Sequence, residues 1–194
     1  MSLAMMIFLI LAPYGAFTLL MLASLPVLSL FAAAAICLMV IAHDIVRGRS
    51  IKMLGAGSAM LFAALGSYLA LVDSGLSSSA IKLAVDCGIF AIALLSLAIR
   101  YPFTLQYARE VVDAQTAALP GFLRANYIIT AVWTTAFLLM LMANVLMIYL
   151  PGLPLWSGLA IAFAARNTAV YFTKWYPNYR RAKFAASEAA LSHS

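Results

Sequence analysis

Six long runs of apolar residues, separated by short polar or Pro- and Gly-containing segments, organise the chain. They cover about residues 3–23, 27–42, 53–72, 80–99, 127–150 and 155–176. Most have about the 20 residues that an α-helix needs to cross the hydrocarbon core of a bilayer. The first run lacks the basic start of a signal peptide and is too long for one, so we expect it to be a retained span. The pattern predicts an all-α, polytopic membrane protein with six transmembrane helices in three hairpins.

The composition supports lipid rather than water as the solvent of this protein. Hydrophobic residues make up 66% of the chain and charged residues 9%, whereas about 25% of a soluble domain is charged. With 194 residues, six spans leave no room for a separate soluble domain, so residues 1–194 are predicted to form a single transmembrane domain. Cys37 and Cys87 lie far apart in apolar runs, which indicates plain buried residues rather than a disulfide or a metal site.

Basic residues predict the orientation in the membrane. The chain has 12 Lys and Arg against 6 Asp and Glu, and most of the cations follow the second, fourth and sixth runs. The turns after the first, third and fifth runs hold almost none. The positive-inside rule then places both termini in the cytoplasm, including a tail over residues 177–194. Because the cations lie in short connections, we interpret them as topological signals and predict no nucleic-acid partner.

A polar, aromatic segment, RYPFTLQYARE, follows the fourth run. Pro102 suits the first turn of a helix, and the alternation of apolar and polar residues after it predicts an amphipathic helix over about residues 103–118. Such a helix can lie in the membrane interface, here on the cytoplasmic side between spans four and five. It is either a connector between hairpins or a docking surface for a cytoplasmic or membrane partner, and the contact residues of that surface would be Gln106, Arg109, Glu110 and Asp113.

One strongly polar residue is predicted near the middle of the bilayer. Arg166 lies about halfway between Trp156 and Trp175, which are typical of the aromatic belts at the two membrane surfaces. An Arg at that depth costs about 2.5 kcal/mol or more on insertion scales. It should therefore face the interior of the helix bundle and have a polar partner.

Candidate partners for Arg166 come from two other spans. Asp86 and Asn144 both lie about 9 Å from the predicted outer end of their helices. We therefore predict a buried polar cluster of Asp86, Asn144 and Arg166, with Asn167 as a further candidate member. Lys82, one turn from Asp86, is a competing partner for its carboxylate. The cluster is either a structural pin or part of a path for a solute or a proton.

Other patterns leave fewer functions open. The third run carries small residues at four-residue spacing, Gly55, Ala59, Ala63 and Ser67, which suit either packing within the bundle or a seam between two copies of the chain. No GxSxG, HExxH or P-loop motif occurs, and the chain has only 2 His, so we predict no enzymatic activity, no metal and no cofactor. His43-Asp44 is either a polar helix end or a proton relay.

The fifth run carries a likeness to a known family. In FLRANYIITAVWTTAFLLMLMANVLM, Asn126 precedes the span, Trp133 has Phe137 one turn on, and Asn144 lies three turns past Trp133. This pattern, over about a quarter of the chain, resembles the intracellular septation protein A family of small bacterial inner-membrane proteins. The resemblance implies a location in the bacterial inner membrane and a role in cell-envelope organisation.

Two functional hypotheses follow. The first is a non-enzymatic protein that works through partners, with the 103–118 segment and the basic tail as its contacts. The second is a transporter of a small solute or ion, or the membrane subunit of one, with Asp86, Asn144 and Arg166 as its site. The midplane Arg favours transport, whereas the scarcity of buried ionisable groups favours a scaffold.

Overall fold

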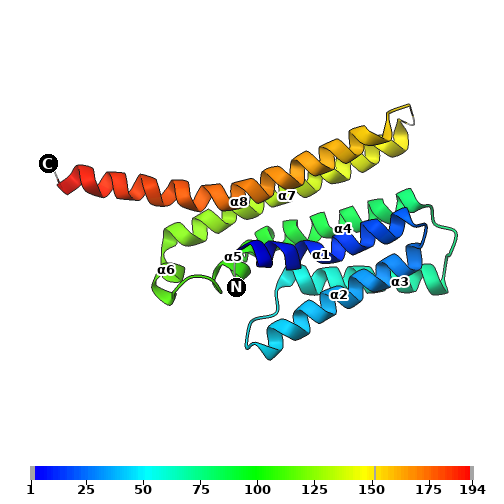
Figure 1. The fold of residues 1–194 in the computed structure, drawn as a ribbon, viewed down its shortest axis with the longest axis horizontal. Coiled ribbons are helices and arrows are strands. Elements are labelled where there is room, and N and C mark those ends of the chain that lie inside the picture. Colours follow the sequence, from blue (N-terminus) through cyan, green and yellow to red (C-terminus); the bar gives the residue numbers. More distant parts are fainter. Residues whose placement is uncertain (1–2, 151, 193–194) are drawn as a thin grey trace.

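The fold is that of a computed structural model, which describes residues 3–150 and 152–192, with side chains for 11–150, 152–154 and 156–183. The described part consists of helices and their connections, which confirms the all-α prediction (Figure 1). The helices are α1 (Leu3–Leu22), α2 (Pro26–Val46), α3 (Met53–Leu71), α4 (Ser78–Ala98), α5 (Phe103–Ala108), α6 (Ala114–Ala118), α7 (Pro120–Tyr149) and α8 (Leu155–Ser192).

The helices form two groups that run roughly parallel to one another. Helices α1–α4 form one group, and α7 and α8 form a long antiparallel hairpin beside it (Figure 1). Helix α4 packs on both α3 and α7 and so joins the two groups. The short turns after α1, α3 and α7 lie at one end, which we call the turn end. The 47–52 connection, α5 and α6 lie at the other, which we call the loop end.

Each group has its own hydrophobic core. In the first, Tyr14 and Phe17 of α1 pack on the fully buried Phe62 of α3, with ring centroids 5.7 and 5.6 Å apart. In the second, Trp133 and Phe137 of α7 pack with Phe103 of α5. Helix α1 therefore packs on α2 and α3, while α8 packs on α7. This division leaves space between α1 and the α7–α8 hairpin.

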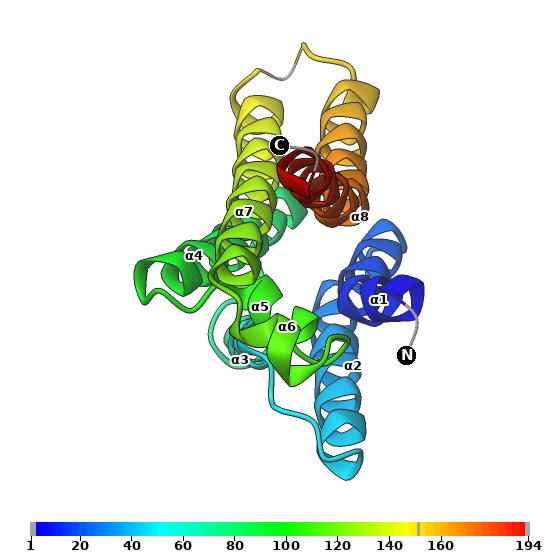
Figure 2. The ribbon, with the colours of Figure 1, turned by 90° about the vertical axis from the view of Figure 1, so that its left-hand side faces the viewer.

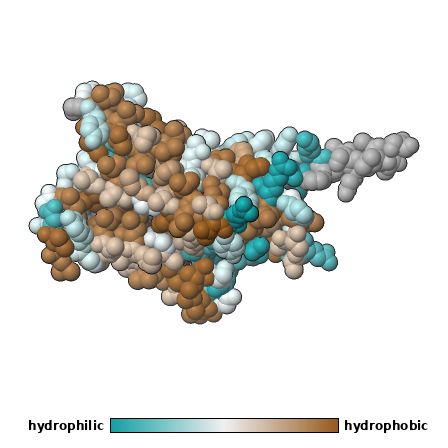
Figure 3. Space-filling model, turned by 180° about the vertical axis from the view of Figure 1, so that it is seen from behind, coloured by the Kyte–Doolittle hydropathy of each residue, from teal (hydrophilic) through white to brown (hydrophobic). Residues whose placement is uncertain are grey.

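Within the described residues, four helices are long and apolar enough to cross a membrane: α2, α3, α4 and α7. The part of α1 whose side chains are described, Leu11–Leu22, forms a shorter apolar helix. Apolar side chains cover much of the outer surface of the helices (Figure 3), as expected for contact with lipid chains rather than water. The chain is therefore a membrane protein.

The small residues of α3 serve packing within the bundle. A Cβ atom at Gly55 would lie 3.9 Å from Ile41 of α2, and one at Gly66 would lie 3.3 Å from the Leu30 Cβ atom. Ala59 is buried in the core of the first group. Gly55, Ala59 and Gly66 thus allow α2 and α3 to approach closely, whereas Ser67 of the predicted row is exposed.

The predicted single helix over 103–118 is wrong. The chain forms two short helices, α5 and α6, because Asp113 starts a new one: its carboxylate accepts a hydrogen bond from the Thr116 backbone N–H at 2.7 Å. This bond also lowers the pKa of Asp113. Helix α5 does not present one face to water. Phe103, Leu105 and Gln106 are buried against the neighbouring helices.

Two helix limits differ from those expected. Helix α7 begins at Pro120, about two turns before the predicted start of the fifth span, because Pro is favourable in the first turn of a helix. Helix α8 continues through Pro177 to Ser192. The predicted tail is therefore largely a continuation of α8 beyond the rest of the bundle (Figure 1).

Candidate functional site

A large cavity lies between α1 on one side and the α7–α8 hairpin on the other, and we call it the cleft. Its volume is about 1680 Å³, and residues of α1, α4, α5, α6, α7 and α8 line it. Figure 2, viewed from the loop end, shows α1 set apart from α7. The volume exceeds the roughly 300–1,000 Å³ of pockets for drug-sized ligands.

The cleft follows most of the length of the bundle. On α7 its lining residues run from Pro120 to Ile148, which at 1.5 Å per residue is about 42 Å. A bilayer with its headgroup regions is about 40–45 Å thick. The cleft thus extends over nearly the whole depth that a membrane would occupy around α7.

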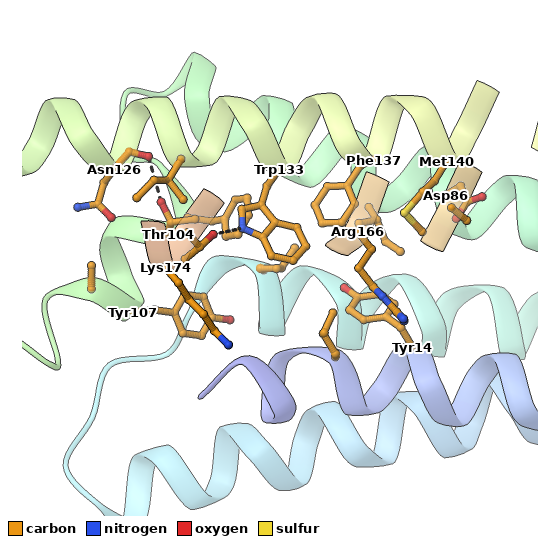
Figure 4. Close-up of a pocket in the computed structure, with 18 of the residues that line it drawn as sticks. Tyr14, Asp86, Thr104, Tyr107, Asn126, Trp133, Phe137, Met140, Arg166 and Lys174 are labelled. Atoms are coloured by element: carbon orange, nitrogen blue, oxygen red, sulfur yellow. Dashed lines mark hydrogen bonds between the residues drawn. The ribbon is translucent and has the colours of Figure 1, made fainter. Parts of the chain in front are cut away.

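The α7 wall of the cleft is apolar in its middle part, and the rims of the cleft are exposed. Ile129, Phe137 and Met140 of α7 line the middle, and Figure 4 shows Phe137 and Met140 facing the cavity. Leu19 of α1 and Leu159 of α8 also line the cleft, and they are 68% and 62% exposed. The cleft is therefore open at the molecular surface between these two helices.

Two members of the predicted polar cluster meet on the cleft wall. The Asn144 Nδ2 of α7 donates a hydrogen bond to the Asp86 Oδ2 of α4 at 2.7 Å, towards the turn end. Lys82 lies one turn from Asp86 on α4 and also lines the cleft. Within the described residues Lys82 makes no ion pair with Asp86. The carboxylate is held by an amide from a neighbouring helix.

Arg166 and Asn167 do not complete the cluster. Arg166 extends from α8 into the cleft (Figure 4), with its guanidinium 5.8 Å from the Phe163 ring centroid, and among the described side chains it forms no ion pair with Asp86. Asn167 is exposed and donates to the Phe163 carbonyl within its own helix. Of these two neighbours on α8, Arg166 lines the cleft and Asn167 does not. Arg166 and Asp86 therefore line the same cavity but do not form the predicted ion pair.

The residues that carry the family likeness all line the cleft: Asn126, Trp133, Phe137 and Asn144. The Trp133 indole N–H donates to the Thr173 hydroxyl of α8 at 2.9 Å and so ties the two helices of the hairpin together. The Thr104 hydroxyl of α5 donates to the Asn126 carbonyl at 3.0 Å. The fifth apolar run therefore supplies a wall of the cleft.

A network of buried charges closes the loop end beside the cleft. Lys52 is 5% exposed, and its Nζ lies 2.7 Å from the carboxylates of both Asp44 and Glu110. Arg49 approaches the same two carboxylates at 3.5 and 3.9 Å. Gln106 accepts a hydrogen bond from the Met53 backbone N–H at 2.6 Å. The network fastens α5 to the ends of α2 and α3.

This network corrects the predicted contact surface. Gln106 is 4% exposed and Glu110 is ion-paired, so both face the protein interior. Arg109 and Asp113 are exposed, and Arg109 lies over the Tyr101 ring rather than pairing with Asp113. Although Arg109 and Asp113 are four residues apart, a turn separates α5 from α6, so the two side chains do not lie on one helix face. The segment is thus mainly an internal support of the loop end.

The sequence does not predict this network, because Lys52 lies in a short basic connection and is interpreted only as a signal of membrane orientation. The adjacent His43-Asp44 was the one available signal, and Asp44 is in fact buried against Lys52. Burial also raises the pKa of Tyr107, whose ring lies 5.8 Å from the Lys52 Nζ. No cluster of three or more His, Cys, Asp or Glu that could hold a metal occurs among the described residues.

Comparisons with models of protein families, with curated proteins and with solved structures found no match. The resemblance to the intracellular septation protein A family therefore stays a prediction. The cleft geometry is the basis for a functional proposal.

Proposed function

We propose that this protein is a non-enzymatic, six-span membrane protein whose cleft binds a long amphiphilic molecule taken from the bilayer. One observation carries the proposal: a single cavity follows α7 for about 42 Å and is open along the side between α1 and α8. The apolar α7 wall suits a ligand with an apolar body, and polar groups line both ends of the cleft, with Arg166 opposite that wall between them. Lipids are the most abundant molecules of this kind around a membrane protein.

The proposed membrane arrangement adds α1 and the first part of α8 to the four candidate spans. Both helices run beside those spans, and the cations Arg47, Arg49 and Lys52 lie at the loop end. By the positive-inside rule this end faces the cytoplasm, in the inner membrane of a bacterium. The test uses a protein in which Cys37 and Cys87 are replaced and one new cysteine is introduced. An impermeant thiol reagent should then label Ser74→Cys in intact cells, and Arg47→Cys only after the cells are permeabilised. The reverse pattern would invert the proposed topology.

The size and apolar α7 wall of the cleft favour a larger ligand than the small solute or ion of the transport hypothesis. An ion or a small polar solute needs a polar path, and the acidic group on the described cleft wall is Asp86 alone. The apolar α7 wall around Phe137 and Met140 instead suits hydrocarbon. The partner hypothesis keeps only Arg109 and Asp113 on its proposed surface, since Gln106 and Glu110 are buried or paired.

Quenching of Trp133 tests the proposal, because this side chain lines the cleft yet is only 7% exposed. The chain has 3 Trp, so Trp156→Phe and Trp175→Phe leave Trp133 as the fluorophore. In bilayers of phosphatidylcholine brominated on its acyl chain, a lipid chain in the cleft brings bromine into contact with the indole. We expect strong quenching.

A variant that fills the cleft provides the control. Gly15 lies on α1 at the cleft, and a Cβ atom there would meet nothing within 4 Å, so Gly15→Phe should occupy the space without strain. Ala64→Phe adds the same ring at an exposed position of α3 away from the cleft. We expect Gly15→Phe to reduce the quenching and Ala64→Phe to leave it unchanged. Equal quenching in both variants would refute lipid entry into the cleft.

A further inference from the structure

The loop end of the cleft carries a row of hydrogen-bond donors on one face of α8. The donors Lys174, Asn178 and Arg181 all line the cleft. Their spacing is i, i+4 and i+7, which places them on one side of a helix. Arg180 lines the cleft as well, and its guanidinium reaches the start of α7 at Gly121. Three cations of α8, Lys174, Arg180 and Arg181, thus line the loop end of the cleft.

The chemistry of this row is selective for anions. Lys and Arg side chains are donors without an acceptor, and Arg matches the geometry of a phosphate with two parallel hydrogen bonds. Among the described residues that line the cleft, the acidic one is Asp86, near the opposite end. No carboxylate of the described cleft wall therefore neutralises Lys174 or Arg181.

The position of the row matches the headgroup level of a lipid lying in the cleft. Figure 4 shows Lys174 at the same end as Thr104 and Tyr107, with Phe137 and Met140 further along the cavity. Lys174 and Arg166 are separated by about 12 Å along α8. A headgroup at Lys174 and Arg181 would direct its acyl chain along the apolar α7 wall of the cleft. Basic pockets between spans on the cytoplasmic side are typical sites for anionic headgroups.

We propose that the loop end of the cleft selects the phosphate of an anionic phospholipid through Lys174 and Arg181. This inference rests on the proposed lipid-binding function and names the class of lipid. Donor atoms face the headgroup, the apolar side chains of α7 face the chain, and entry is through the open side between α1 and α8. Zwitterionic lipids would bind less well because their own ammonium group opposes these cations.

The test compares two lipids in the Trp133-only protein. Phosphatidylglycerol and phosphatidylcholine, each brominated on the acyl chain, are titrated separately into bilayers of unbrominated phosphatidylcholine. We expect a preference for phosphatidylglycerol in the quenching curves. Lys174→Gln and Arg181→Gln should each reduce that preference by about fivefold, since a basic residue near an anionic surface contributes about 1 kcal/mol.

Lys183→Gln is the matched control, because Lys183 is exposed on the same helix and does not line the cleft. Its preference for phosphatidylglycerol should equal that of the parent protein. If all three variants lose the preference equally, the net charge of the helix is responsible and the site is refuted. Inorganic phosphate should not displace the brominated lipid, and displacement would reassign the site to a soluble anion.

The outcomes separate this inference from the proposed function. Equal quenching by both brominated lipids would leave lipid binding in place and overturn the headgroup selectivity. Absence of quenching by either lipid would overturn both proposals. Retained helix content by circular dichroism shows that each variant is folded.

Discussion

Removal of the Lys52 charge should be among the most damaging single changes at the loop end. Lys52→Met keeps most of the volume and deletes the charge that lies 2.7 Å from both Asp44 and Glu110. The two carboxylates would then face each other with only Arg49, at 3.5 and 3.9 Å, to offset their repulsion. Deleting one partner of a buried ion pair costs about 3–5 kcal/mol, and we expect a loss in free energy of unfolding within that range.

The two carboxylates should not respond equally. The Glu110 side chain is more exposed than that of Asp44, so solvent screens it more. Glu110→Gln leaves the Lys52–Asp44 pair intact and should cost about 1.5–3 kcal/mol, typical of a hydrogen bond to a charged group. The double variant Lys52→Met/Glu110→Gln should lose less than the sum of the single changes, because the second removes a carboxylate that the first leaves unpaired.

The assay is reversible unfolding in mixed micelles of increasing sodium dodecyl sulfate content, followed by far-ultraviolet circular dichroism. Lys183→Met serves as the control, since Lys183 is exposed and surface changes usually stay within about 0.5 kcal/mol. A Lys52→Met variant as stable as Lys183→Met would show that the network contributes little. The interpretation of the α5 segment as an internal support of the loop end would then be wrong.

Two further predictions concern the helix contacts around the cleft and use the same unfolding assay. Thr173→Val removes the acceptor of the Trp133 indole N–H and should cost about 0.6 kcal/mol, the average for hydrogen bonds between membrane helices, and no more than about 1.7 kcal/mol; an unchanged free energy of unfolding would show that this bond does not stabilise the hairpin. Asp86→Asn and Arg166→Gln should be additive within about 0.5 kcal/mol, whereas Asp86→Asn and Asn144→Leu should be coupled through their hydrogen bond. Coupling of Asp86 with Arg166 instead would restore the ion pair that the structure lacks.

The sequence was a good guide where structure depends on local pattern. Apolar runs bounded by Pro, Gly and charged residues marked the positions of the long helices, because a membrane helix must carry apolar side chains along its length. The pairing of Asp86 with Asn144 could also be predicted, since equal depth in two spans brings side chains to the same level. Depth does not fix rotation about the helix axis, which is why the prediction failed for Arg166 and Asn167.

The buried position of α5 could not be read from its residues. Gln106 and Glu110 have the polarity of a solvated helix face, and their partners Met53 and Lys52 lie more than 50 residues earlier in the chain. The residues around Gln106 and Glu110 contain no pattern that predicts a contact with so distant a part of the chain. The start of α6 does have a local signal, because Asp is a favoured residue at the N-cap of a helix. The amphipathic pattern across residues 103–118 instead favours one continuous helix.

Native mass spectrometry of the intact protein tests the central claim most directly. After gentle release from detergent, the wild-type protein should retain one lipid molecule per chain, and Gly15→Phe should retain none while Ala64→Phe behaves as wild type. A phosphate-containing anionic lipid should account for the retained mass. The same distribution of bound lipid in wild type and Gly15→Phe would contradict the account, because the cleft between α1 and α8 would then not be where lipid binds.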